Sequence, residues 1–232
     1  MIKLVLTCEH GGNNIPKEYQ KIFRDSAKLL STHRGYDIGA LELFNNLISQ
    51  ADYYSFSETS RLLIELNRSL KNKNLFSAVT KPLDSFIKDE IKKNYYFPYR
   101  DKVESQIAYF IKQKHTVIHI SVHTFTPVFN NVTRNCDIGF LYDPSHSLEK
   151  QFCKSIKKNI IQNNPSLNVR YNFPYLGTAD GFTSYLRKIF PKENYLGIEI
   201  EVNQKFPSKK NKEWNKIVHI IYDSLTRTLA DF

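Results

Sequence analysis

Cysteine is scarce in this 232-residue sequence, and the three that occur, Cys8, Cys136 and Cys153, are widely spaced. An odd, scattered set argues against a disulfide framework, and the lack of a CxxC pair argues against a cysteine-rich zinc site. Because this usage is typical of the reducing cytosol, we expect a cytoplasmic protein.

Long apolar runs are also absent. None approaches the ~18–20 residues that span a bilayer. The N-terminal "IKLVL" is too short for a signal peptide and lacks a small-residue cleavage site, so we interpret residues 2–7 as a strand and expect no membrane partner. No repeat, low-complexity linker or break in composition divides the chain, which predicts a single domain over residues 1–232.

Charge is unbalanced, with 33 Lys and Arg against 23 Asp and Glu, a net charge of +10. Such an excess can mark a surface that binds nucleic acids or membranes. Here the basic residues are scattered through segments such as "KSIKKN" and "KFPSKKNKEWNK", mostly on the polar faces of predicted helices. This distribution favours a solvated surface without a nucleic-acid partner; attraction of an anionic substrate is a further possibility.

Apolar periodicity predicts strands that alternate with helices. We expect strands over residues 2–7, 52–57, 61–66, 116–123, 136–143, 167–172 and 195–202. We expect helices over residues 36–50, 85–94, 100–114, 147–162, 183–190 and 211–229. Helical crossovers of this length predict a three-layer α/β fold with a mostly parallel central sheet. Segment 70–100 is the expected excursion from that sheet.

Ionisable side chains follow several of the predicted strands. Glu9 and His10 follow the first strand, His123 ends the "VIHISVH" strand, and Glu199 and Glu201 lie on the "GIEIEV" strand. Asp37 begins a helix, where an N-cap is the alternative role. Because α/β folds bind ligands at the carboxyl ends of their strands, we expect these side chains to form one site.

The residue types at this edge suit a hydrolytic zinc site. Catalytic zinc takes three ligands from His and carboxylate and keeps one position open for water, whose proton a further carboxylate removes. His10, Asp37 and His123 form the predicted ligand set, and Glu201 is the predicted general base. Neighbours on a strand face opposite ways, so we expect only one of Glu9 and His10 at the metal, His10 being the better ligand. Gly11 and Gly12 would let the backbone turn away and leave room beside the metal.

Seven stretches of the sequence carry a likeness to a known family: "CEHGGNNIPKEY", "HRGYDIGALEL", "SRLLIELNRS", "VIHISVHTFTPV", "RNCDIGFLYD", "YLGTADGFTSYLR" and "YLGIEIEVNQ". In this order they resemble the N-formylglutamate amidohydrolase family, in particular its shorter, predicted members. The resemblance implies a phosphorylase/hydrolase-like α/β fold and metal-dependent hydrolysis of an N-acyl amino acid, a small anionic substrate. A more distant likeness to zinc-dependent N-acetylmuramoyl-L-alanine amidases falls on His10, Asp37, His123 and Glu201.

Two alternatives to this function stay open. One is an amidase for peptidoglycan or peptides, which should have a wide cleft; a small-molecule enzyme should enclose its ligand with segment 70–100 or the "FTPVFNNVTRN" loop. The other is a binding protein on the same fold that has lost the metal.

Arginine suits the substrate carboxylate because it can donate two parallel hydrogen bonds. The candidates are Arg134, which we favour, Arg61 and Arg68, with Asn67 beside them; Arg187 is a further one. Arg61 and Arg68 could instead pair with Glu65 or Asp37. His119 is interpreted as a core histidine, His33 as a residue that orients the Asp37 loop, and Glu199 as a second acid or the partner of a buried arginine.

Overall fold

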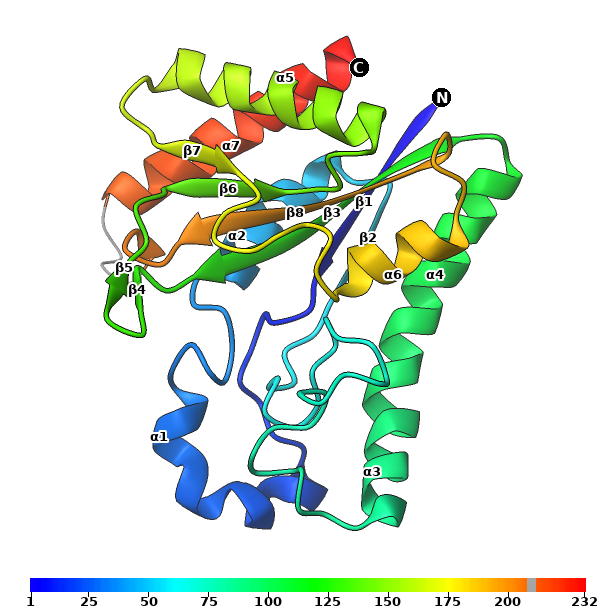
Figure 1. The fold of residues 1–232 in the computed structure, drawn as a ribbon, viewed down its shortest axis with the longest axis vertical. Coiled ribbons are helices and arrows are strands. Elements are labelled where there is room, and N and C mark those ends of the chain that lie inside the picture. Colours follow the sequence, from blue (N-terminus) through cyan, green and yellow to red (C-terminus); the bar gives the residue numbers. More distant parts are fainter. Residues whose placement is uncertain (208–211) are drawn as a thin grey trace.

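A six-stranded sheet forms the centre of the computed structural model, which describes residues 1–207 and 212–232 (Figure 1). The strands are β1 (Ile2–Cys8), β2 (Tyr53–Phe56), β3 (Thr116–Phe125), β6 (Ile138–Leu141), β7 (Val169–Tyr171) and β8 (Tyr195–Asn203). Their order is β2-β1-β3-β8-β6-β7; only the β6–β8 pair is antiparallel. The mostly parallel α/β fold predicted from the sequence is confirmed.

Helices cover both faces of this sheet. The α-helices are α1 (Ala27–Leu30), α2 (Ala40–Leu47), α3 (Ser85–Ile91), α4 (Phe97–Lys112), α5 (Ser147–Asn163), α6 (Phe182–Ile189) and α7 (Lys212–Asp231). The 3₁₀ segments are η1 (Lys17–Ser26) and η2 (Ile48–Gln50), and η3 (Lys92–Tyr96) is π-helical. In these two described ranges, no helix is long and apolar enough to cross a membrane.

The two faces of the sheet differ in character. Residues with even numbers in β3 and β8, such as Ile120 and Ile200, pack with α2, α5 and α7 in one apolar core. The opposite face packs against α4 and α6 near the amino ends of the strands. Toward the carboxyl ends, that second face carries the polar side chains of Ser121 and His123 on β3 and of Glu199 and Glu201 on β8.

One local expectation needs correction, and two elements of the structure were not expected. The predicted strand over 61–66 is wrong: the segment forms turns, and its side chains are buried in the second core without pairing to the sheet. Its continuous apolar run reflects a buried loop, which periodicity does not distinguish from a buried strand. The helical stretch 17–30 and the hairpin of β4 (Val128–Phe129) and β5 (Val132–Thr133) were not expected. Residue 211 of the predicted last helix lies outside the described residues.

Segment 70–100 leaves the sheet as expected. Figure 1 shows α3 and the loops before it on the side of the sheet where β1 and β2 end, with the loops between α3 and α1 in this view. Cation–π and apolar contacts with α4 and α6 fix this segment, for example Arg100 over the rings of Phe182 and Tyr185.

Gly11 and Gly12 have a different role from the one expected. The chain after β1 runs beside segment 57–60, with Gly11 N donating to Ser57 O at 3.0 Å and Asn14 N to Glu58 O at 2.9 Å. A Cβ on Gly12 would lie 2.6 Å from the carbonyl oxygen of Glu58. The glycines therefore permit close approach of two backbones, which holds the turn that carries His10.

A Gly12→Ala variant is accordingly expected to lose about 1–3 kcal/mol of unfolding free energy, the usual effect of overpacking. Gly11→Ala should lose less, because its Cβ would meet its nearest atom at 3.0 Å. Denaturant unfolding of both variants measures the difference. A Gly12→Ala variant as stable as the wild type would contradict the close-approach explanation.

Candidate active site

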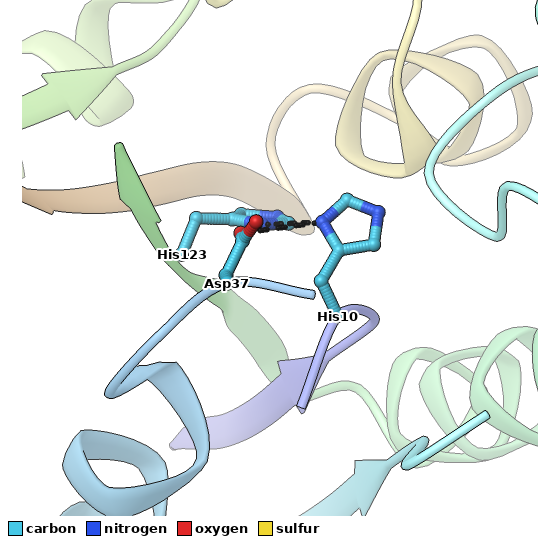
Figure 2. A group of neighbouring side chains, drawn as sticks. All are labelled: His10, Asp37 and His123. Atoms are coloured by element: carbon cyan, nitrogen blue, oxygen red, sulfur yellow. Dashed lines mark hydrogen bonds and ion pairs between the residues drawn. The ribbon is translucent and has the colours of Figure 1, made fainter. Parts of the chain in front are cut away.

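Three separate segments bring the predicted ligands together (Figure 2). His10 follows the end of β1 by two residues, Asp37 precedes α2, and His123 lies near the end of β3. The backbone couples two of them, because Asp37 N donates to His10 O at 2.9 Å. All three side chains are buried, so their polar atoms face one another instead of bulk water.

The ligand atoms have the mutual spacing of a metal site. Asp37 Oδ2 lies 3.3 Å from His10 Nδ1 and 3.0 Å from His123 Nδ1, and the two nitrogens are 3.2 Å apart. Ligands about 2.0–2.1 Å from a tetrahedral zinc ion lie roughly 3.3–3.4 Å from one another. Two neutral imidazole nitrogens that face each other need a proton or a cation between their lone pairs. The three residues therefore fit a divalent cation.

A carboxylate supports His10 from behind. His10 Nε2 bonds to the Glu65 carboxylate, whose other oxygen accepts from Arg61 Nε at 2.8 Å. Arg61 also donates from Nη1 to Asp37 Oδ1 at 3.1 Å. A carboxylate behind a ligating imidazole fixes the ring and makes it a stronger ligand. Arg61 thus forms ion pairs with Glu65 and Asp37. These pairs are the structural role that the sequence left open for Arg61 beside substrate binding.

A second carboxylate supports His123. Glu9 Oε2 lies 3.3 Å from His123 Nε2, and Ser121 Oγ bonds to both groups, at 2.8 Å to the imidazole and 2.5 Å to the carboxylate. Tyr99 OH donates to the other Glu9 oxygen at 2.9 Å. Glu9 therefore lies behind a ligand, not at the metal position. The sequence signal for Glu9 was its place beside His10 at the end of β1, the strand that pairs with the His123 strand β3.

Glu201 lies beside this cluster. It is the register partner of His123 on β3 and of Gly139 on β6. Its Oε2 atom is buried and has no hydrogen-bond partner within the described chain. Burial, reinforced by the charges of Asp37 and Glu199, raises the pKa of Glu201 to about 8. A buried carboxylate oxygen without a protein partner beside the ligands is free to bond to water or substrate.

Glu199 is held differently from Glu201. Its Oε1 accepts from Thr183 Oγ1 at 2.9 Å, and its Oε2 lies 3.5 Å from Asn67 Nδ2. No arginine pairs with Glu199 among residues 1–207 and 212–232, because the nearby Arg187 pairs with Glu149 at 2.8 Å. The arginine partner considered from the sequence is wrong: Thr183 and Asn67 hold the carboxylate, and His123 Nε2 lies 3.9 Å from its Oε2.

The cluster is strongly acidic although the chain as a whole is basic. Five buried carboxylates face two guanidinium groups in and around it: Glu9, Asp37, Glu65, Glu199 and Glu201, with Arg61 and Arg68. Burial would raise the pKa of Asp37, but His10, His123 and Arg61 hold it well below its usual range. The pKa of His123, which burial would lower, is raised by Asp37 and Glu9. Such a field favours a bound cation.

A cavity of about 190 Å³ opens beside the ligands. Its wall includes Arg61, Arg68 and Asn67, and the polar residues Thr124, Asp180 and Gln204. None of residues 70–100 lines it, whereas Phe125, Thr126 and Phe129 of the "FTPVFNNVTRN" loop do. Of the two segments expected to enclose a small substrate, the 125–135 loop lines this cavity and segment 70–100 does not.

The arginine candidates occupy different positions. Arg68 lines the cavity and uses Nη1 for the carbonyls of Asn67 and Asp180, at 2.9 and 2.6 Å. Arg134 is not among the lining residues; it donates to Thr126 Oγ1 and, at 3.1 Å, to Tyr175 OH. In the described part of the chain, Arg68 Nη2 has no hydrogen-bond partner. Asn67 accepts from Phe182 N at 2.6 Å and so fixes this wall.

The other histidines stand apart from the ligand cluster. His119 bonds to Thr7 Oγ1 and Tyr195 OH at 2.8 and 2.7 Å, as expected for a core histidine, and burial lowers its pKa to about 4. His33 lines the cavity but does not belong to the group of potential metal ligands, which contains His10, Asp37 and His123 in the described residues.

The α/β fold brings the candidate ligands and Glu201 together near the carboxyl ends of β1, β3 and β8, an arrangement suited to an enzyme of the hydrolase class. Residues 2–206 match the family described as N-formylglutamate amidohydrolase, and the chain belongs to that family. This confirms the resemblance noted in the sequence and supports amide hydrolysis as the class of reaction.

Two solved structures are similar over almost the whole chain. The gene product Atu2144 from Agrobacterium tumefaciens is 24% identical with a TM-score of 0.82, covering 99% of this chain and 91% of that one. N-formylglutamate amidohydrolase from Ralstonia eutropha JMP134 is 14% identical with a TM-score of 0.73, covering 98% and 93%. At these identities the two structures establish the fold. No curated protein sequence matches the chain closely enough to add to the family assignment.

Proposed function

We propose that this protein is a metal-dependent amidohydrolase that cleaves the amide bond of a small N-acyl amino acid, N-formylglutamate-like, to a free amino acid and formate or another small carboxylate. The observation that carries the proposal is the convergence of His10 Nδ1, Asp37 Oδ2 and His123 Nδ1 within 3.3 Å, beside a Glu201 oxygen that has no hydrogen-bond partner among the described residues. The metal is a single divalent cation, zinc by the chemistry of the donor set.

The residues divide the work as follows. A divalent cation at the three ligands would supply Lewis acidity toward the amide carbonyl and toward water. Glu201 accepts the proton of the attacking water and passes it to the departing amine. Glu65 and Glu9 hold the two imidazoles in orientation. Arg68 binds the substrate carboxylate, with Asn67 fixing the wall on which it stands.

The size of the cavity favours a small substrate over a peptidoglycan strand, which needs a wide cleft. The experiment incubates zinc-loaded protein with N-formyl-L-glutamate, N-acetyl-L-glutamate and a soluble muropeptide, and follows free amine and carboxylate by mass spectrometry. Cleavage of the N-acyl amino acids is the expected result. Cleavage of the muropeptide alone would assign a peptidoglycan amidase, and no cleavage with metal bound would favour the binding protein.

We also propose a cytoplasmic location and a single domain.

Arg68→Ala is expected to raise KM for an N-acyl amino acid by about 10–100-fold, the loss of one or two charge-assisted hydrogen bonds. The measurement compares N-acetyl-glutamate with an N-acetyl amine of the same size, which has no carboxylate. Equal losses on both substrates would contradict the assignment. Arg134→Ala is the matched variant, since the sequence alone favours Arg134: a larger rise in KM there would return the role to that residue.

A further inference from the structure

Exposed apolar side chains surround the mouth of the cavity. Phe129, Tyr175 and Leu176 all line it, yet they are 45%, 46% and 62% exposed, so they lie at the boundary between the cavity and solvent. Val128 and Val132 of the same hairpin are 53% and 66% exposed. Large apolar groups gathered around a pocket are typical of a ligand-binding surface. We name Phe129, Tyr175 and Leu176 the apolar rim.

The apolar rim is fixed in place. The Arg134 guanidinium lies 4.6 Å from the Phe129 ring centroid and 5.1 Å from that of Tyr175, and it donates to Tyr175 OH. Arg134 therefore joins the β4–β5 hairpin to the segment after β7. That segment is held against β6, because Asn172 Oδ1 accepts from the backbone N–H groups of Tyr142 and Gly177, both at 3.0 Å. A preformed surface can bind apolar groups without first being ordered.

The strand register orders the groups of the site along β3 and β8. Ser121 pairs with Glu199 at the inner level, His123 with Glu201 at the middle level, and Phe125 with Asn203 at the outer level. The hairpin with Phe129 begins beyond the outer level.

The wall with Arg68 reaches from the inner level to the middle level. Asn67 Nδ2 lies 3.5 Å from Glu199 Oε2 and 3.4 Å from His123 Nε2, and a Cβ on Gly181 would lie 3.1 Å from Glu199 Oε1. Arg68 and Asp180 are the chain neighbours of Asn67 and Gly181, and Arg68 Nη1 donates to Asp180 O. The predicted ligand His123 thus has this wall toward the inner level, whereas the chain of β3 continues from it, through the outer level, to the hairpin with Phe129.

We propose that the apolar rim binds the acyl group of the substrate, and that this acyl group is an apolar chain of several carbons instead of formyl. This rests on the proposed function: with the carboxylate at Arg68 and the amide at the middle level, the acyl group points to the outer level. A formyl group ends at its carbonyl carbon and would leave the apolar rim in water. A chain of several carbons extends toward the apolar rim, and each buried methylene strengthens binding about fourfold.

The test measures binding on the zinc-loaded Glu201→Gln protein, in which the amide stays intact. Calorimetry with N-formyl-, N-butanoyl- and N-hexanoyl-L-glutamate should give a Kd that falls at least tenfold from the first to the last. Adding Phe129→Ser and Leu176→Ser should remove most of that gain. Phe86→Ser, on α3 and 73% exposed, is the matched control and should retain it.

The outcomes separate the acyl subsite from the proposed function. A flat Kd series overturns the subsite, whether or not the wild type hydrolyses any of the three compounds. A falling Kd series without hydrolysis by the zinc-loaded wild type supports the subsite and overturns the proposed function. Equal loss in Phe86→Ser would mean unspecific apolar binding and overturn the subsite. Tighter binding of N-formyl-L-phenylalanine than of N-formyl-L-glutamate, with a flat acyl series, would assign the rim to the amino-acid side chain and overturn it too.

Discussion

Glutamine in place of Glu201 is expected to lower kcat by about 10²–10⁴-fold, the usual contribution of a general base, while metal content and fold are retained. Glutamine keeps the size of the side chain but cannot accept the proton of the attacking water. The side chain lies beside His123 in the register, and its Oε2 makes no hydrogen bond to residues 1–207 or 212–232, so its replacement breaks no contact with them at that atom. The measurement is kcat with metal content and thermal midpoint determined on the same preparation.

Glu199→Gln is the matched control for Glu201→Gln. Both glutamates lie on one face of β8, but Glu199 already accepts from Thr183 Oγ1 and contacts Asn67. Loss of its charge should cost about 1–3 kcal/mol of unfolding free energy, because buried donors lose a charged acceptor. Its effect on kcat should be the smaller of the two. Near wild-type turnover in Glu201→Gln with metal bound, and a large loss in Glu199→Gln, would transfer the role of base to Glu199.

The regular elements of the fold were predictable because their side chains repeat. The helix at 147–163 buries one periodic set of residues, and the spacing of that set is written in the sequence. The strand at 116–125 is buried on both faces, and its run of β-branched and apolar residues predicts a central strand. Parallel order followed from the helical crossovers, which made it predictable that His10, His123 and Glu201 would share one edge of the sheet.

The irregular parts of the site could not be predicted in the same way. Glu65 supports His10 from a loop whose apolar neighbours read as a strand, and its distance of 55 residues from His10 carries no periodic signal. The apolar rim depends on the hairpin 128–133, two short strands that pair with each other and form a sheet separate from the six-stranded one. Arg134 was assigned to a carboxylate on its position in the chain, whereas its contacts depend on how two loops meet. Tertiary packing, not local pattern, decides these cases.

Metal binding should disappear when two of the three ligands are removed. The double variant His10→Ala, His123→Ala leaves Asp37 as the single ligand of the set, and one carboxylate does not hold zinc against water. Elemental analysis of the purified protein is expected to give about one zinc per wild-type chain and almost none in the variant. His33→Ala, which removes an imidazole from the cavity wall outside the ligand set, is the control and should retain the metal.

The same variants connect metal to stability. A ligand that binds only the folded chain stabilises it by about 2.7 kcal/mol at a concentration 100 times its Kd. Added zinc should therefore raise the thermal midpoint of metal-stripped wild type and His33→Ala, and leave that of the double variant unchanged. The double variant should also be less stable without metal, because Glu65 and Glu9 lose their imidazole partners inside the protein. Full zinc occupancy in the double variant, or a zinc response equal to that of the wild type, would place the metal elsewhere and remove the basis of the assigned ligand set.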